Sequence, residues 1–335
     1  MLIVWIDTNT EGNVQQTIEG WQLVRDIEER GYAEFEHHIS PDTIDNLINR
    51  YANFTLSHPD PLPSTMNAML PDSDDATDMS HRLDELDRSA DTQDEWHKYR
   101  TNTQQVGKPD GYTNRSFQEK ALKQARGLIL PPEDPKEFYH FTPRHYGAMS
   151  RNHQEYDWGS IPSEVSDLNN AFAAIHAKAS ELIVRICGIV EETHPEIRKF
   201  VTAESLRTSP IRLLFYHPSN GDSLGAGHYD KGAMTLQLAE SHRGLRVAPG
   251  NEAPLEEVVR TAENAAFFPG TAIDEHHTPG SPYQPGWHDI VKTDILNDGR
   301  SIPSKASEVC ARWAIIFFAN YENFRQPNKA DTHTR

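Results

Sequence analysis

The pattern of apolar positions divides the chain into a helical first part and a strand-rich second part. Apolar side chains recur at steps of three across residues 17–30, at Ile18, Trp21, Val24 and Ile27, which predicts an amphipathic helix that ends at Gly31. Residues 32–36 then alternate as a short strand. A second helix is expected to begin at Pro41 with Ser40 as its cap. The chain therefore opens in the order helix, strand, helix.

The clearest helix is predicted over residues 163–195. Its apolar side chains recur at alternating steps of four and three, at Leu168, Phe172, Ile175, Ala179, Leu182, Ile186 and Ile189. Such a stripe covers one face of a helix. We expect this helix to pack along a sheet as a scaffold.

Short, regularly spaced strands follow the long helix. Runs of β-branched or aromatic residues, separated by Gly, Pro and Asn, occupy residues 211–216, 233–238, 244–247, 265–268, 289–291 and 312–318. This spacing is typical of a β-barrel or a β-sandwich. The sequence therefore predicts a mainly β fold with flanking helices.

The chain between its helical and strand-rich parts turns polar over residues 58–126. This composition fits a lid, or an ordinary solvated connection with short helices. We expect residues 1–150 to form a helical and strand-containing region that includes this segment. Residues 151–335 are expected to form the β core with its scaffold helix, and the two regions together one compact catalytic unit.

Charge and cysteine content exclude several classes of function. The formal net charge of −18 disfavours nucleic-acid binding, because phosphate contacts need a basic face. Cys187 and Cys310 match neither a disulfide framework nor a CxxC metal site, so both are expected to be buried thiols. No apolar run approaches the roughly 20 residues that span a bilayer, and residues 1–7 lack a basic leader. We expect a cytoplasmic protein that binds a small molecule and neither nucleic acid nor membrane.

The first candidate chemistry is a histidine and a carboxylate two positions apart, His228 and Asp230. Residues i and i+2 of a strand point to the same face, so both side chains could converge on one metal ion. Gly225 and Gly227 precede them and allow close backbone approach. Since this spacing is frequent by chance, a structural or surface role is the plain alternative.

A third ligand has to come from His242, His276, His277 or His288. His276 and His277 lie in a polar loop, where a solvated pair is the simpler interpretation, and His277 is the second choice. His288 precedes an apolar run, and a metal ligand needs the rigid support that a strand gives. Two histidines and one carboxylate with open positions form the facial triad of non-heme Fe(II) oxygenases.

Arg312 begins the most apolar run of the second half. A guanidinium in such a position is rarely without a partner. The partner is either a structural carboxylate or a bound carboxylate held by the arginine fork. Tyr216 could donate its hydroxyl to the same anion, or serve as a core tyrosine.

Five segments with candidate motifs follow one another in a fixed order, at residues 213–218, 228–236, 244–247, 268–270 and 312–318. They resemble the tyrosine-proline stretch, the H-x-D-x-G-x-x-T-L motif, the G-L-x-V strand, the proline-glycine turn and the R-x-S-x-x-F-F strand of one superfamily. This superfamily comprises the 2-oxoglutarate and Fe(II)-dependent oxygenases, and the resemblance is to its isopenicillin N synthase-like branch. Residues 31–39, 111–112 and 134–138 resemble earlier segments of the same superfamily, so the resemblance covers most of the chain, and the shared order is quite specific.

The resemblance implies a double-stranded β-helix, which is a jelly-roll variant. It implies that His228, Asp230 and His288 are the catalytic ligands of Fe(II). It further implies that Arg312 holds the distal carboxylate of 2-oxoglutarate, with help from Tyr216. The expected reaction uses O2 to hydroxylate or desaturate a small molecule, such as an amino acid or natural-product intermediate, and releases succinate and CO2.

Two departures from the family pattern keep alternatives open. Ala314 stands where the family has a serine, which removes one hydroxyl donor to the co-substrate. The interval from His288 to Arg312 is longer than in the family, so residues 292–309 are expected to form an inserted hairpin or loop. Ala314 favours an Fe(II) oxidase of the isopenicillin N synthase type that needs no 2-oxoglutarate. A non-catalytic β-helix binding protein with a degenerate site is the third possibility.

Overall fold

The computed structural model describes residues 11–57, 111–114, 136–155, 159–191, 197, 201–217, 221–275, 283–297 and 310–320. Except for residues 111–114, the polar segment 58–126 lies outside these ranges. No helix within the described ranges combines the length and the apolar character that crossing a membrane requires.

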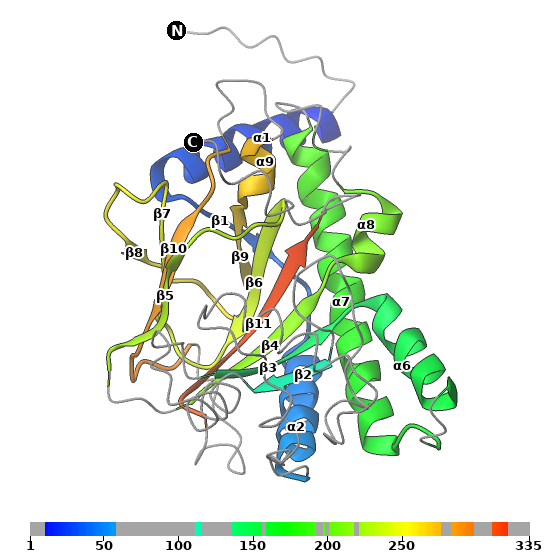
Figure 1. Ribbon diagram of the computed structural model, residues 1–335. Helices are drawn as coiled ribbons and strands as arrows, with labels where there is room; N and C mark the ends of the chain where they lie inside the picture. The colour runs from blue at the N-terminus through cyan, green and yellow to red at the C-terminus, as the bar shows by residue number, and fades with distance from the viewer. Residues whose placement is uncertain are drawn as a thin grey trace, which may run out of the picture.

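The described strands form two antiparallel sheets that face each other (Figure 1). The larger sheet has the order β1 (Ala33–Glu36), β9 (Asn264–Pro269), β6 (Met234–Glu240), β11 (Arg312–Ala319), β4 (Ile211–Tyr216), β3 (Lys136–Phe141) and β2 (Gly111–Asn114). The smaller sheet has the order β5 (Ser223–His228), β10 (Trp287–Val291), β7 (Leu245–Ala248) and β8 (Glu256–Glu257). The expected jelly-roll core with flanking helices is confirmed.

Helices cover the face of the larger sheet that is turned away from the smaller one (Figure 1). The helices among the described residues are α1 (Glu11–Arg30), α2 (Pro41–Ser57), α6 (Pro143–Glu155), α7 (Ser163–Val190), α8 (Ala203–Thr208) and α9 (Thr271–Glu275). All seven apolar positions of the predicted stripe on α7 are buried. The scaffold role that we expected of this helix is therefore confirmed, although α7 ends at Val190.

Strand β11 is buried on both faces of the larger sheet. Its residues Trp313, Ile315 and Phe317 belong to the core between the sheet and the helices. Ile316 and Phe318 point the other way, into the space between the two sheets. Because successive side chains of a strand alternate between faces, a strand buried on both faces reads as one continuous apolar run.

Local signals in the sequence located the elements well where they were strong. The Ser40 hydroxyl accepts a hydrogen bond from the backbone N–H of Thr43 at 3.2 Å, which confirms the predicted cap of α2. Strand β3 was not predicted, because the buried polar residues Glu137 and His140 interrupt its apolar pattern.

Strands of the first 150 residues share the larger sheet with later strands. The domain division at residue 150 stays a prediction.

Both cysteines are buried free thiols, as expected. Cys187 lies on α7, and Cys310 lies just before β11. Burial raises the pKa of the Cys310 thiol well above its usual range. Neither thiol lines the cavity between the sheets.

The contact between α7 and the larger sheet yields a stability test at Phe172. Its ring stacks on Tyr139 and Phe141, with centroid distances of 5.1 and 5.8 Å. Replacement by alanine leaves a cavity, so Phe172→Ala should lower the free energy of unfolding by about 3–5 kcal/mol in urea titrations. Val184→Ala on the exposed face of α7 should change it by no more than about 0.5 kcal/mol. Equal effects of the two substitutions would contradict this packing.

Candidate metal centre

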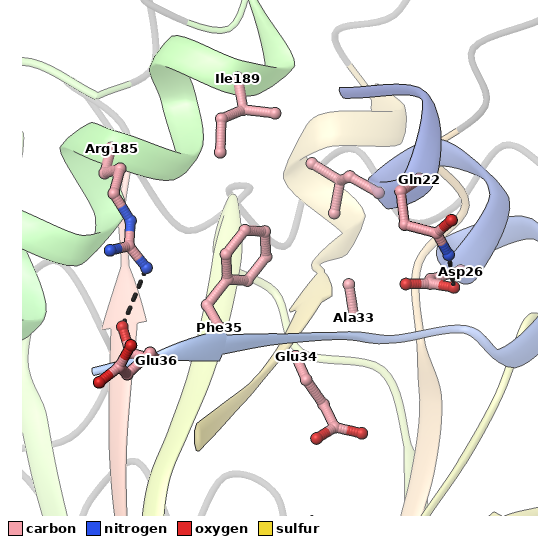
Figure 2. Close-up of a pocket in the computed structure, with 9 residues that line it drawn as sticks. Gln22, Asp26, Ala33, Glu34, Phe35, Glu36, Arg185 and Ile189 are labelled. Atoms are coloured by element: carbon pink, nitrogen blue, oxygen red, sulfur yellow. Dashed lines mark hydrogen bonds between the residues drawn. The ribbon is translucent and has the colours of Figure 1, made fainter. Parts of the chain in front are cut away.

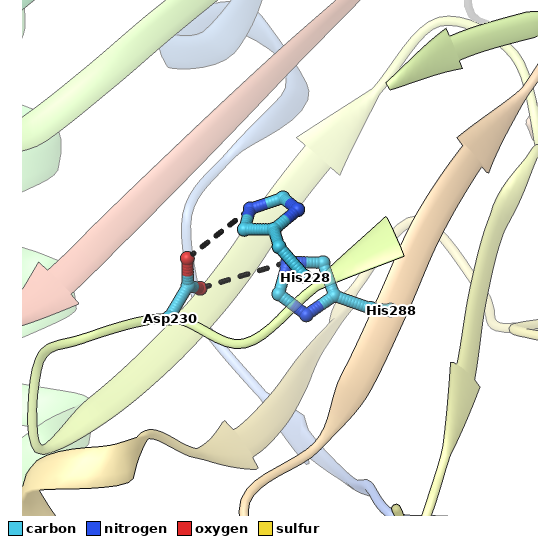
Figure 3. A group of neighbouring side chains, drawn as sticks. All are labelled: His228, Asp230 and His288. Carbon is cyan, nitrogen blue, oxygen red and sulfur yellow. Dashed lines mark ion pairs between the residues drawn. The ribbon is translucent and has the colours of Figure 1, made fainter. Parts of the chain in front are cut away.

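Two of the predicted ligands lie on neighbouring strands of the smaller sheet. His228 is the last residue of β5, and His288 is the second residue of β10. The antiparallel register places the two residues directly opposite each other. Their imidazole rings therefore lie side by side, with centroids 4.4 Å apart (Figure 3).

The third predicted ligand, Asp230, lies in the loop that follows β5 rather than on the strand. The expectation that strand alternation aligns it with His228 is therefore wrong, because β5 ends first. The loop is held by contacts from elsewhere in the chain. The Thr235 hydroxyl donates to Asp230 Oδ2 at 2.7 Å, and the Thr271 N–H donates to the Asp230 carbonyl at 2.8 Å.

Close packing by glycine fixes the course of this loop. A methyl group on Gly270 would lie 2.1 Å from the Gly232 carbonyl oxygen and 3.0 Å from that of Asp230. The proline-glycine turn therefore needs glycine so that it can support the loop. On the other side, a methyl group on Gly227 would lie 2.7 Å from the Trp287 ring. These contacts come from distant segments, so the carboxylate position is a tertiary property.

The three side chains converge closely enough to share one ion. His228 Nε2 lies 3.6 Å from Asp230 Oδ1, and His288 Nε2 lies 3.8 Å from Asp230 Oδ2 (Figure 3). All three donor atoms lie within 4.8 Å of one another. Two atoms that each lie about 2.1 Å from one ion are separated by about 4.2 Å at most. Both nitrogen–oxygen distances satisfy this limit.

Backbone carbonyls orient both imidazoles for metal binding. His228 Nδ1 donates to the carbonyl of Ala226 at 2.9 Å, and His288 Nδ1 donates to that of Gly286 at 3.1 Å. A carbonyl only accepts hydrogen bonds, so each Nε2 keeps its lone pair toward Asp230. Desolvation and the neighbouring His288 lower the pKa of His228, which favours its neutral, metal-binding form. Two nitrogen donors and one carboxylate fit Fe(II).

A cavity between the two sheets contains all three side chains. It is also lined by two basic residues, Lys136 from β3 and Arg212 from β4. The other lining residues are Leu214, Tyr216, Thr235, Gln237, Phe268, Ile290, Ile316 and Phe318. Neither basic residue was predicted as part of the site. The available signal for Arg212 was a charged residue at an inward-facing position of an otherwise apolar strand.

Arg312 is not among the residues that line this cavity, although it lies against one of them. Arg312 is 1% exposed, and its Nη2 donates to the carboxylate of Glu240. Its Nε donates to the carbonyl of His242 at 3.2 Å, and its guanidinium lies 5.3 Å from the Tyr216 ring centroid. Glu240 also pairs with Arg260 at 3.4 Å. Of the two partners considered for Arg312, the structure provides the structural carboxylate.

The remaining histidine candidates do not join the cluster. His242 lies next to the buried ion pair, where its backbone pairs with Leu296. His276 and the second choice, His277, lie outside the described residues. Within the described ranges, His228, Asp230 and His288 are the one group whose geometry could hold a metal ion.

A larger cavity of about 470 Å³ lies between α1, β1 and α7 (Figure 2). Polar side chains that line this cavity already form hydrogen bonds with neighbouring protein groups. Gln22 donates to Asp26 at 2.7 Å, and Arg185 Nη2 donates to the carbonyl of Glu36 at 2.9 Å. No group of metal-ligating side chains is found there among the described residues.

Comparisons with known proteins identify the fold. No model of a protein family matches the sequence, and no curated protein matches it. A full-length Neurospora crassa protein, solved in complex with alpha-KG and 5-formyluracil, is 14% identical, with a TM-score of 0.55 over 93% of this chain and 81% of that one. A Caulobacter crescentus protein assigned to the 2OG-Fe(II) oxygenase family is 14% identical, with a TM-score of 0.53 over 94% and 85% of the two chains. A Shewanella oneidensis protein provisionally named an oxygenase is 16% identical, with a TM-score of 0.52 over 90% and 87%. At these identities the likeness establishes the fold that the sequence resemblance implied.

The hydrogen bond from Thr235 to Asp230 yields a test of the metal centre. Thr235→Val keeps the shape of the side chain but removes the donor that orients the carboxylate. Affinity for Fe(II), measured by anaerobic titration, should fall about 10- to 100-fold. Thr208→Val removes a buried hydroxyl that donates to the Ser205 carbonyl, away from the cavity, and should leave the affinity unchanged. An unchanged affinity in Thr235→Val would contradict this role.

The buried ion pair of Arg312 yields a stability test at Glu240. Glu240→Gln removes the buried carboxylate charge with which both Arg312 and Arg260 pair. Its free energy of unfolding should fall by about 3–5 kcal/mol in urea titrations. Glu181→Gln removes an exposed carboxylate that pairs with Lys178 and should cost no more than about 1 kcal/mol. A similarly small effect at Glu240 would show that the buried pair is not required.

Proposed function

We propose that this protein is a non-heme Fe(II), 2-oxoglutarate-dependent oxygenase that oxidises a small molecule. The observation that carries the proposal is the convergence of His228, Asp230 and His288 in a cavity between the two sheets. The fold shared with the Neurospora crassa protein, which was solved in complex with alpha-KG, supports the choice of co-substrate. The proposed product is a hydroxylated or desaturated amino acid or natural-product intermediate.

The residues of the chain would bind and orient the reactants. The two imidazoles and the carboxylate of Asp230 would hold Fe(II) on one face and leave its other positions to ligands. Bound Fe(II) would supply the activation of O2 that is coupled to decarboxylation of 2-oxoglutarate to succinate and CO2. Thr235 would keep Asp230 in place. The apolar side chains of Phe268, Ile290 and Phe318 line the cavity and would limit the access of water.

The distal carboxylate of 2-oxoglutarate needs a cationic partner in this cavity. The sequence resemblance proposes Arg312 and Tyr216, of which Tyr216 lines the cavity. Arg312 pairs with Glu240 and does not line the cavity. The serine of the family motif is replaced by Ala314, which is fully buried and offers no hydroxyl. The lining offers Lys136 and Arg212 in their place.

A second candidate is an Fe(II) oxidase that needs no 2-oxoglutarate. Ala314 and the engagement of Arg312 with Glu240 favour it, since both weaken the family's usual co-substrate clamp. The two basic residues in the cavity support the first candidate, because they could bind the second carboxylate of 2-oxoglutarate. A non-catalytic binding protein would not need the three converging ligands.

One assay separates these candidates. The protein is loaded with Fe(II) without oxygen, mixed with or without 2-oxoglutarate, and then exposed to O2 while succinate is measured. We expect succinate only with 2-oxoglutarate and at least a 100-fold loss in His228→Ala, by the order of effect known for catalytic groups. His38→Asn, at an exposed position outside the cavity, should retain full turnover.

Each other outcome of this assay identifies a different candidate. Succinate formation that persists in His228→Ala would exclude the proposed iron site. Substrate oxidation without 2-oxoglutarate would identify the oxidase. A wild-type protein that binds no iron would identify the non-catalytic binding protein.

A further inference from the structure

We propose that Arg212, and not Arg312, binds the distal carboxylate of 2-oxoglutarate. This inference rests on the proposed oxygenase function and assigns one contact within its site. Arg212 lines the cavity that holds the candidate metal ligands, whereas Arg312 does not. An arginine is always charged at neutral pH and can bind a carboxylate through two parallel hydrogen bonds.

Residues that lie opposite one another on neighbouring strands form a row across the sheet. The strand register places Arg212 one inward-facing row from the metal centre. Arg212 lies opposite Ile316 of β11, and Ile316 lies opposite Gln237 of β6. All three side chains line the cavity. The next inward-facing row toward the metal centre contains Phe318 and Thr235, which are also paired. Two residues along a strand span about 7 Å.

The length of the co-substrate matches this spacing. Thr235 holds Asp230, so its row marks the position of the metal ligands. In 2-oxoglutarate the distal carboxylate carbon is three carbon–carbon bonds from the keto carbon, which is about 4 Å in an extended chain, and a hydrogen bond from a donor adds about 3 Å, which gives about 7 Å in all. A carboxylate at this distance from the metal-bound end would therefore reach the row of Arg212.

Arg312 is both deeper and already engaged. It precedes Ile316 by four residues on β11, which moves its backbone about 13 Å farther along the strand. Its guanidinium donates to Glu240, and both side chains are 1% exposed. To bind the co-substrate, Arg312 would have to break its hydrogen bond to the buried carboxylate of Glu240, which would then keep only Arg260 and the Gln237 amide as partners. Removing a charged partner from a buried pair is unfavourable.

Neighbouring rings hold the Arg212 guanidinium in place. Its central carbon lies 5.0 Å from the ring centroid of Phe138 and 4.6 Å from that of Phe318. Its Nε donates to Nε2 of the buried His140. Cation–π contacts and this hydrogen bond restrict the side chain before a ligand arrives. A side chain fixed in this way loses less entropy on binding.

Lys136 is the competing cation in the same cavity. It pairs with Tyr216, in the row that also contains Arg312, and its Nζ lies 5.9 Å from the Tyr216 ring centroid. The backbone of Lys136 therefore lies farther from the metal centre than that of Arg212, although its charge is close enough to act on His228. A lysine provides a single point charge rather than a fork. It is the matched control for loss of a positive charge from the cavity lining.

The test compares two ligands on each protein. Mn(II)-loaded full-length protein, which avoids turnover, is titrated by calorimetry with 2-oxoglutarate and with 2-oxopentanoate, which has a methyl group in place of the distal carboxylate. We expect Arg212→Gln to weaken 2-oxoglutarate binding about 10- to 100-fold and to leave 2-oxopentanoate binding little changed. Arg212→Lys should fall between Arg212→Gln and the wild type. Lys136→Met and Arg312→Gln should retain the wild-type preference.

The ratio of the two affinities guards against a folding defect, because each protein serves as its own reference. If Arg212→Gln keeps the wild-type ratio of affinities, the assignment to Arg212 is overturned. If Lys136→Met or Arg312→Gln instead loses the preference for 2-oxoglutarate, the substituted residue is the one that binds the distal carboxylate. If the wild-type protein itself does not prefer 2-oxoglutarate, the proposed co-substrate fails as well. Should Arg312→Gln not fold, the comparison of Arg212→Gln with Lys136→Met still decides the assignment.

Discussion

Burial of the larger sheet on both faces is the constraint on which the rest of the structure depends. Alternate residues of β4, β6 and β11 must fill the core beneath α7, and the residues between them must face the smaller sheet. A shift of one residue in register would exchange these two sets. The apolar side chains that pack against α7 therefore also determine that Arg212, Thr235 and Gln237 face the cavity.

The candidate metal centre combines two histidines on paired strands with a carboxylate in a loop that needs support. Pairing of β5 with β10 places His228 opposite His288, and backbone carbonyls orient both rings. Asp230 does not lie on a strand, so the hydrogen bond from Thr235 and the packing of the turn at Gly270 fix its position. Substitutions in this support should therefore affect metal affinity without altering any ligand.

The charges inside the protein are distributed differently from those of the whole chain. The net charge is −18, yet the described cavity lining contains Arg212 and Lys136 and only one carboxylate, Asp230. Deeper between the sheets, Glu240 accepts hydrogen bonds from Arg312 and Arg260. Arg312 thus has a structural partner, Glu240, whereas the partner of Arg212 in our proposal is a bound ligand. The overall charge is therefore a poor guide to what the cavity binds.

The sequence by itself determined most of the elements and singled out His228, Asp230 and His288, the three side chains that converge. The stripe on α7, the cap at Ser40 and most strands of the core are local patterns, which a periodicity of 3.6 or 2 makes visible. The order of motifs then indicated the jelly-roll fold and selected His288 over the other histidines. Strand β3 escaped, because its buried polar residues break the pattern on which such predictions rest.

Only the tertiary structure decided which groups meet. Asp230 turns toward the histidines because Thr235 and Thr271 hold its loop, although β5 has already ended. Arg312 meets Glu240, a residue 72 positions away, and Arg212 joins the cavity through its register with β11. The physical reason is that a periodic pattern fixes the face to which a side chain points. The partner on that face is chosen by strand register and packing between segments far apart in the chain.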